Sequence, residues 1–119
     1  MAPIRVRRIY EEPVPEDGVR VLVDRLWLRG MTEEGARLDR WAKELAPSPE
    51  LRRWYGHRPE RFEGFAQRYR EELSRPEARS ALEELRALAR RGTLTLLTAT
   101  RDVERSGARV VAEVLRRGR

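Results

Sequence analysis

Residues 19–30 decide the fold class, and they read Val19-Arg20-Val21-Leu22-Val23-Asp24-Arg25-Leu26-Trp27-Leu28-Arg29-Gly30. The nearly continuous apolar run is typical of a strand that is buried on both faces, as in a parallel sheet. We expect this strand to extend from Val19 to Leu26 and to lie in the centre of the sheet. Ligands of α/β proteins usually bind beyond the carboxyl ends of strands, so the polar cluster that begins at Asp24 marks a candidate site.

The rest of the chain alternates between strand-like and helix-like patterns. Two further strands are expected, at 4–10, with Ile4, Val6 and Ile9 facing inward, and at 93–98. A loop with turn residues fills 11–18. Helices are expected from capping residues, prolines and apolar stripes at 32–45, 48–55, from 59, from 76 to Gly92, and 104–117. Trp41 and Trp54 lie on helical stripes of this scheme and are assigned to the core.

The order of these elements predicts an α/β fold. We expect a small, mostly parallel sheet of three or more strands, packed by about four to five helices, in a single domain over residues 1–119. The long helical connection between the second and third strands favours a parallel crossover. The direction of the first strand stays open, because its connection is too short for a packed helix. If the last two strands are parallel, Asp24 and Arg25 lie near 98–102.

Composition excludes several kinds of chemistry. The chain has no cysteine and one histidine, which excludes disulfides and thiolate nucleophiles and argues against a zinc site, so we expect no metal. No dinucleotide fingerprint or phosphate loop occurs, so we expect no cofactor. Without a long apolar stretch or a signal-peptide core, we expect a cytoplasmic protein with no membrane partner. Asparagine and cysteine are absent and charged residues are dense, which is typical of a thermophile, whereas the ratio of 25 arginines to one lysine could equally reflect a GC-rich genome.

The formal net charge of +6 raises the question of nucleic acid. The excess leans toward the C-terminus, while most other arginines alternate with glutamates on helix faces. Such alternation more often makes a solvated, salt-bridged surface than a phosphate groove. A nucleic-acid-binding module therefore remains an alternative, and it would use the arginines of the last helix: Arg105, Arg109, Arg116, Arg117 and Arg119.

Residues after the second strand, together with one distant arginine, are the first candidates for a site. Asp24 could act as a general base or orient a ligand, but it could equally form an ion pair or cap a loop. Arg25, Arg29 and Arg52 could clamp a phosphate or carboxylate, although any single arginine of this chain could be ordinary surface. Trp27 could stack on a planar ligand or simply pack.

Three residues elsewhere complete the candidate set. His57 is the natural proton carrier because its unperturbed pKa is near neutrality, but it could also satisfy backbone amides between Gly56 and Pro59. Thr98 and Asp102 follow the last strand and precede a helix, where anions often bind. Asp102 could equally cap that helix.

A resemblance covers nearly the whole chain. The linked motifs Arg8-x-Tyr10, Asp17-Gly18-x-Arg20-Val21-Leu22-Val23-Asp24-Arg25-Leu26-Trp27, Ala46-Pro47-Ser48, Leu51-Arg52-x-Trp54-Tyr55-x-His57-x-Pro59 and Thr95-Leu96-Leu97 resemble the YeaO-like branch of the domain-of-unknown-function 488 family. The resemblance implies a small α/β fold with a site at these motifs, and no established reaction. The chain departs from the branch at Leu28, where proline is usual, at Thr98, where tyrosine is frequent, and at Arg105-Ser106, where His-Asn is frequent.

Three hypotheses follow from these patterns. The first is a small enzyme, or a relic of one, that binds an anionic metabolite or nucleotide in a cleft at the strand ends, with acid–base chemistry by His57 or Asp24. The second is the nucleic-acid-binding module, which is less favoured. The third is a non-catalytic interaction protein whose strand-end cluster is a buried ion network. The sequence leaves the oligomeric state open.

Overall fold

The computed structural model of the chain describes residues 4–24 and 36–117. The described residues form a four-stranded parallel sheet in the order β1-β4-β2-β3, with β1 at Ile4–Arg8, β2 at Val19–Leu22, β3 at Arg40–Trp41 and β4 at Leu94–Thr98. The predicted parallel pairing of the second strand with the last is confirmed. The first strand, whose direction the sequence left open, is also parallel, and β4 separates it from β2.

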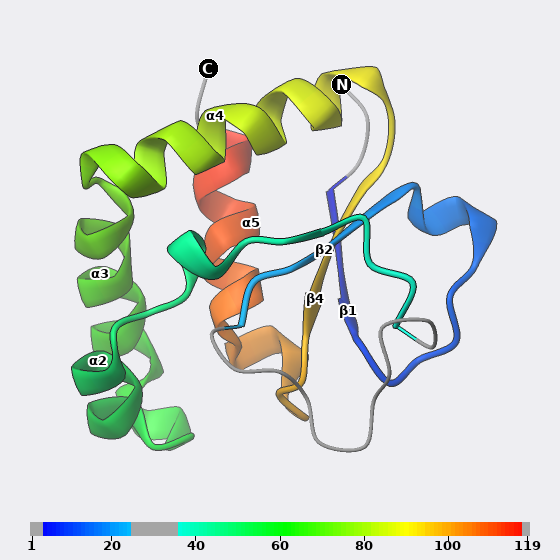
Figure 1. Cartoon of the computed structure of the whole chain (residues 1–119). Helices are drawn as coiled ribbons and strands as arrows, with labels where there is room; N and C mark the ends of the chain where they lie inside the picture. The colour runs from blue at the N-terminus through cyan, green and yellow to red at the C-terminus, as the bar shows by residue number, and fades with distance from the viewer. Residues whose placement is uncertain (1–3, 25–35, 118–119) are drawn as a thin grey trace.

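The described helices confirm the predicted α/β class. Figure 1 shows them gathered on one side of the strands, with the first connection, which carries the short turn η1, on the other side. The α-helices are α2 (Pro49–Tyr55), α3 (Phe62–Leu73), α4 (Pro76–Arg91) and α5 (Gly107–Arg117). Single 3₁₀ turns lie at η1 (Pro15–Asp17), η2 (Lys43–Leu45), η3 (Pro59–Arg61) and η4 (Val103–Arg105).

The capping residues of α2 act as the sequence predicts. The Ser48 hydroxyl accepts a hydrogen bond from the Leu51 amide at 3.2 Å, which satisfies one of the free donors of the first turn. The same hydroxyl donates to Glu72 of α3 at 2.6 Å, so the cap also docks α2 on α3. Gly56 ends the helix in the left-handed conformation, with φ at 54°.

The predicted helix over 32–45 is wrong from Arg37 onward, where a turn, an edge strand and the single 3₁₀ turn η2 follow one another. Arg40 and Trp41 form the edge strand β3, and the flanking amides of Asp39 and Ala42 donate to β2 carbonyls at 2.9 and 2.8 Å. Leu38 and Trp41 pack against the second apolar cluster of the sheet, so strand pairing overrides their helix-like spacing. The last helix also begins three residues later than predicted, at Gly107, after η4.

The sheet has two unequal apolar faces. The larger face carries Ile4, Val21 and Leu96 and packs against α3, α4 and α5. The smaller cluster contains Ile9 and Leu22 and lies on the opposite face. Every residue of β4 is buried, so this strand lies in the interior of the fold, and the strand order places β2 in the interior of the sheet, as the sequence predicts. Trp54 packs against the larger cluster and Trp41 against the smaller, but both side chains are only half-buried and Trp41 is in a strand.

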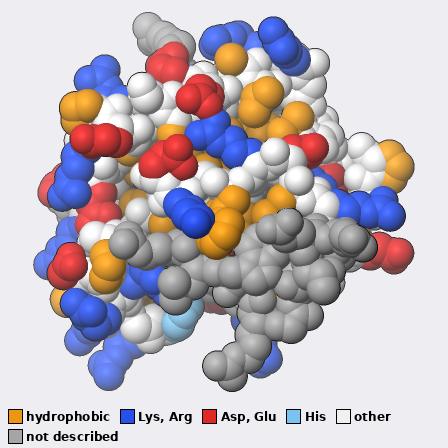
Figure 2. Space-filling model, in the orientation of Figure 1, with side chains coloured by type: hydrophobic (Ala, Val, Ile, Leu, Met, Phe, Trp, Pro, Cys, Tyr) orange, Lys and Arg blue, Asp and Glu red, His pale blue; other side chains and the backbone are white. Residues whose placement is uncertain are grey.

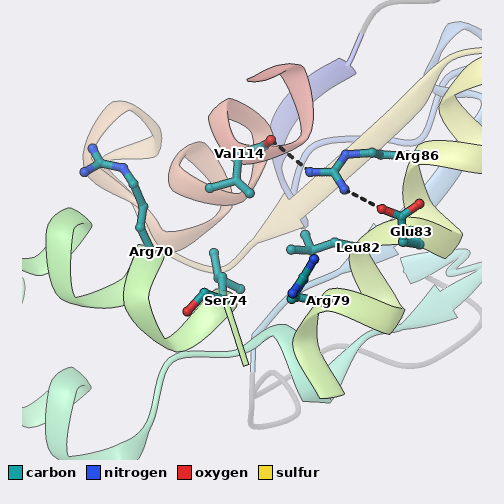
Figure 3. Close-up of a pocket in the computed structure, with 8 residues that line it drawn as sticks. Arg70, Ser74, Arg79, Leu82, Glu83, Arg86 and Val114 are labelled. Atoms are coloured by element: carbon teal, nitrogen blue, oxygen red, sulfur yellow. Dashed lines mark hydrogen bonds and ion pairs between the residues drawn. The ribbon is translucent and has the colours of Figure 1, made fainter. Parts of the chain in front are cut away.

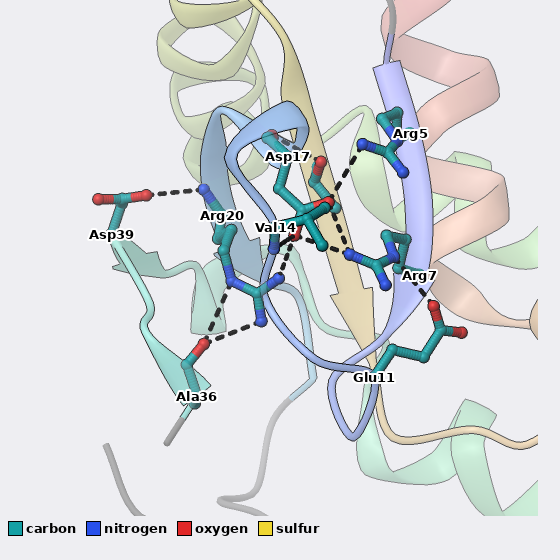
Figure 4. Close-up of polar contacts among 9 residues, drawn as sticks. Arg5, Arg7, Glu11, Val14, Asp17, Arg20, Ala36 and Asp39 are labelled. Atoms are coloured by element: carbon teal, nitrogen blue, oxygen red, sulfur yellow. Dashed lines mark hydrogen bonds and ion pairs between the residues drawn. The ribbon is translucent and has the colours of Figure 1, made fainter. Parts of the chain in front are cut away.

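A fully buried carboxylate, Asp17, fixes the irregular connection between β1 and β2 (Figure 4). Its oxygens accept hydrogen bonds from Arg7 at 2.8 Å and from Arg20 at 2.6 Å, and Arg5 lies 3.2 Å away. Burial alone raises the pKa of Asp17, but hydrogen bonds from Arg7, the Val14 amide and Arg20 outweigh it, and the pKa is lowered. The connection is thus held to both strands by charge.

The next residues explain how this connection reaches β2 on the far side of β4. The Thr95 hydroxyl of β4 donates to the Asp17 carbonyl at 2.7 Å, so the connection runs across the face of β4. Gly18 follows with φ at 62°, and a Cβ there would lie 2.2 Å from the Thr93 carbonyl oxygen. Only glycine fits this close crossing. The parallel arrangement therefore depends on a tight turn and a buried ion network rather than on a helix.

Candidate functional site

The two segments that the sequence predicts to meet do lie together. One carboxylate oxygen of Asp24, just beyond β2, accepts the Ala99 amide hydrogen just beyond β4, at 2.9 Å. The Thr98 hydroxyl accepts the Thr100 amide at 3.1 Å. The Asp24 carbonyl accepts the Trp41 indole N–H at 2.6 Å, so three strands meet around this residue. The carboxyl edge of the sheet is the candidate site.

Asp24 is held in a partly desolvated environment. Burial raises its pKa above the ordinary value, and the Ala99 amide, the charge of Arg52, the Thr98 hydroxyl and His57 each lower it in part. The net shift is upward. Asp24 is therefore more easily protonated than an exposed aspartate, and a protonated carboxyl can donate a hydrogen bond to a ligand. The same contributions place Arg52 and His57 within electrostatic reach of the carboxylate.

An aromatic wall from α2 and α3 supports this edge. The rings of Tyr55 and Phe65 stack at 4.3 Å, and Phe65 and Tyr69 lie 5.4 Å apart. The Tyr55 hydroxyl donates to the Arg105 carbonyl at 2.7 Å and ties α2 to η4. Tyr69 is fully buried, and burial followed by the charge of Asp24 raises its pKa well above the ordinary value. These contacts hold α2 against α3 and η4, and so fix where the residues after α2 begin.

His57 occupies a strained backbone position at the end of α2. Its φ is 56°, directly after the left-handed Gly56, and its ring lies 6.2 Å from that of Tyr55. Left-handed backbone is uncommon in residues other than glycine and is frequent at ligand sites. Arg52 lies one turn earlier on α2 and is exposed. In the described part of the chain, Arg52 makes no ion pair.

Arg8 is a further candidate for this edge, which the sequence did not single out. It is the last residue of β1, and the strand register places it beside Thr98 of β4. Its guanidinium lies over the Tyr10 ring at 5.3 Å, while its buried Nε has no hydrogen-bond partner among the described residues. Buried donors are seldom left unpaired without a reason. Two features of the sequence could have indicated Arg8: its position at the end of a predicted strand and its place in the Arg8-x-Tyr10 motif.

Of the remaining predicted site residues, the structure describes Asp102 but not Arg25, Trp27 or Arg29. The Asp102 carboxylate is half-exposed and pairs with Arg105 at 2.9 Å, and it makes no capping hydrogen bond to η4. Its charge contributes to the raised pKa of Tyr55, after burial, so it lies near the aromatic wall. The amino end of α5 is capped instead by Ser106, whose hydroxyl accepts the Arg109 amide at 3.2 Å. Three predicted ligand residues lie outside the described residues: Arg25, Trp27 and Arg29.

The described part of α5 bears on the nucleic-acid alternative. Arg109 pairs with Glu104 at 3.2 Å, and Arg116 donates to the Ile4 carbonyl at 2.6 Å. Arg105, in η4, is paired with Asp102. Figure 2 shows basic and acidic side chains interspersed on the face it presents, rather than a patch of one sign. Most of the arginines named for this alternative are therefore already engaged within the protein.

Residues 4–24 and 36–117 contain no group of three or more histidine and acidic side chains placed to hold a metal ion. Within the same ranges, the helices are too short or too polar to cross a bilayer.

The fold and the site define a small parallel α/β domain with a polar carboxyl edge. The family model described as the inactive DUF488-N3 subclade matches residues 3–118. Uncharacterized proteins of Mycobacterium tuberculosis and Mycobacterium bovis are each 52% identical over 112 residues, which cover 94% of this chain and 92% of theirs. The uncharacterized protein YeaO of Escherichia coli is 35% identical over 113 residues, covering 95% and 96%. The chain belongs to the DUF488 family, in its YeaO-like branch. No solved structure matches it.

Proposed function

We infer that this protein binds a small anionic ligand at the carboxyl edge of the sheet and does not transform it. The observation that carries the proposal is the set of donors around that edge. Arg8 brings a buried guanidinium nitrogen without an acceptor in the described structure, and Arg52 brings an exposed guanidinium near Asp24. Guanidinium groups suit phosphates and carboxylates because their planar donors match these anions.

Asp24 can take part in such a site despite its charge. A carboxylate would repel an anion, but the raised pKa of Asp24 lowers the cost of protonating it when an anion approaches. The resulting acid can donate one hydrogen bond to the ligand while its other oxygen still accepts from Ala99. Binding would then be accompanied by uptake of a proton. Proton uptake on binding would distinguish a specific site that includes Asp24 from non-specific attraction of the anion to surface arginines.

The non-catalytic part of the proposal rests on the residues that depart from the branch. Ser106 is buried and caps α5, and Thr98 is buried and accepts a backbone hydrogen bond. Both side chains are occupied by structural contacts and neither is suited to acid–base chemistry at neutral pH. The family description, which calls the subclade inactive, is in keeping with this view.

The test is a titration followed by amide NMR, with adenosine monophosphate and citrate as probes. We expect saturable shifts at Ala99, Thr100 and His57, and a loss of about tenfold in affinity for Arg52→Gln. The matched control is Arg53→Gln, which removes the neighbouring exposed arginine. Arg8→Gln is expected to weaken binding in the same way, and Asp24→Asn to remove the proton uptake.

Three results would each contradict a part of the proposal. Equal losses in Arg52→Gln and Arg53→Gln would indicate attraction to surface charge rather than a site. Turnover of either probe would contradict the non-catalytic part while leaving the binding part intact. The third result is a half-saturation concentration of the probe that changes with salt but not with pH between 4 and about 7. It would show that protonation of Asp24 has no part in binding.

A further inference from the structure

A hollow of about 450 Å³ lies on the helical layer, where the end of α3, the middle of α4 and the second half of α5 meet (Figure 3). Its volume is in the range of small-molecule sites. Apolar side chains from the three helices form part of its lining: Leu73, Leu82 and Val114. None of these residues belongs to the carboxyl edge, so the hollow is a separate feature of the molecule.

Three arginines line the same hollow against a single carboxylate, Glu83. Arg86 is mostly buried and is fixed by two contacts, to Glu83 at 3.0 Å and to the Val114 carbonyl at 3.3 Å. A guanidinium has five N–H donors, so Arg86 has N–H groups that these two hydrogen bonds do not use. Its buried Nε has no hydrogen-bond partner in the described residues. Arg86 is thus held in place by two hydrogen bonds while part of its hydrogen-bonding capacity is unused.

The other two arginines, Arg70 of α3 and Arg79 of α4, are exposed. Neither forms an ion pair with any described residue. In Figure 3 the Arg79 side chain extends alongside Leu82, and that of Arg70 extends outward from α3. Exposed side chains change rotamer within nanoseconds, so Arg70 can close over an anion held by the other two. Concentrating like charges around a concave surface is unfavourable unless an anion neutralises them.

We propose that this hollow is a second binding site, which takes a phosphate monoester that carries an apolar group. The phosphate pairs with Arg79 and Arg86, with Arg70 closing from the opposite helix, and the apolar group lies on Leu82 and Val114. Bidentate pairing with guanidiniums favours a phosphate, and the apolar lining favours an organic ester over the free ion. The proposal does not depend on the function assigned to the carboxyl edge.

The experiment is an amide NMR titration of the whole chain with phenyl phosphate, with inorganic phosphate and benzyl alcohol as partial probes. We expect saturable shifts at Ser74, Leu82 and Val114, with phenyl phosphate binding about tenfold more tightly than inorganic phosphate and benzyl alcohol causing no saturable shift. Arg79→Gln should weaken binding about tenfold, and Arg79→Lys by less, because it keeps the charge but loses the planar fork.

The matched control is Arg90→Gln, which removes an exposed arginine of the same helix that does not line the hollow. Equal weakening by this control would overturn the proposal, as would the absence of saturable shifts up to about 10 mM probe. Shifts at these amides with an oligonucleotide or an acidic peptide, but not with phenyl phosphate, would also overturn it. Arg52→Gln should leave the phenyl phosphate shifts at Ser74, Leu82 and Val114 unchanged, and Arg79→Gln should leave any shifts at Ala99 and Thr100 unchanged. Failure at the carboxyl edge and failure at the hollow therefore give different results.

Discussion

Replacing Asp17 with asparagine tests whether the buried ion network holds the first connection in place. Asparagine keeps the size of the side chain and one acceptor, but it removes the charge that Arg5, Arg7 and Arg20 share. Removing one partner of a buried ion pair typically costs about 3–5 kcal/mol, because the remaining charges are left buried without compensation. Arg20 is the main contributor to this cost, since its side chain is only 5% exposed.

The expected loss is a large share of the total stability. A domain of this size is stabilised by about 5–15 kcal/mol, and each kcal/mol lost lowers Tm by about 4 °C, so Asp17→Asn should melt about 12–20 °C below the parent chain. The assay is thermal unfolding by circular dichroism, with urea unfolding as a second measure. The control is Glu11→Gln, which breaks the half-exposed pair with Arg7 and should cost less than about 1 kcal/mol.

The pH dependence gives an independent check on the same residue. The pKa of Asp17 is lowered in the folded protein, so its contribution is present above its unfolded value of 3.8 and is lost as pH falls through the folded pKa. The parent chain should lose stability in that acid window, and Asp17→Asn should lose less there. If Asp17→Asn melts within about 4 °C of the parent at pH 7, the network is not what fixes the connection.

Three other changes are expected to have distinct effects. Asp24→Asn should raise Tm at pH 7. The pKa of Asp24 is raised in the folded protein, so the protonated carboxyl stabilises the fold below 3.8 and this stabilisation is lost as pH rises through the folded pKa. A lower Tm of the variant, measured by calorimetry, would refute this. Gly18→Ala should cost more than about 2 kcal/mol in urea unfolding, from left-handed backbone and the clash with Thr93, and a neutral result would mean that the turn can move. Ser48→Ala should cost about 1–2 kcal/mol through loss of the α2 cap, whereas Ser80→Ala, on an exposed face of α4, should be neutral in the same assay.

The sequence alone determined the elements whose signals are local. Ser48, Pro49 and Gly56 mark both ends of α2 because capping and left-handed backbone are properties of single residues. The apolar stripes of α3, α4 and α5 predicted which faces are buried, and Ala108 and Val111 are indeed buried. The continuous apolar run of β2 and the long helical connection to β4 predicted that these strands are parallel, and from this the meeting of Asp24 with the end of β4 could be predicted.

Features that depend on distant partners became visible only in the folded chain. The spacing of Leu38 and Trp41 suits a helix, but hydrogen bonds to β2 made their segment an edge strand, a gain that no local pattern reveals. Arg5, Arg7 and Asp17 look like ordinary surface charges in the sequence. They form a network around the buried Asp17 carboxylate because the first connection folds back across β4. That path, with Arg8 beside Thr98, is set by packing over the whole chain rather than by any one segment.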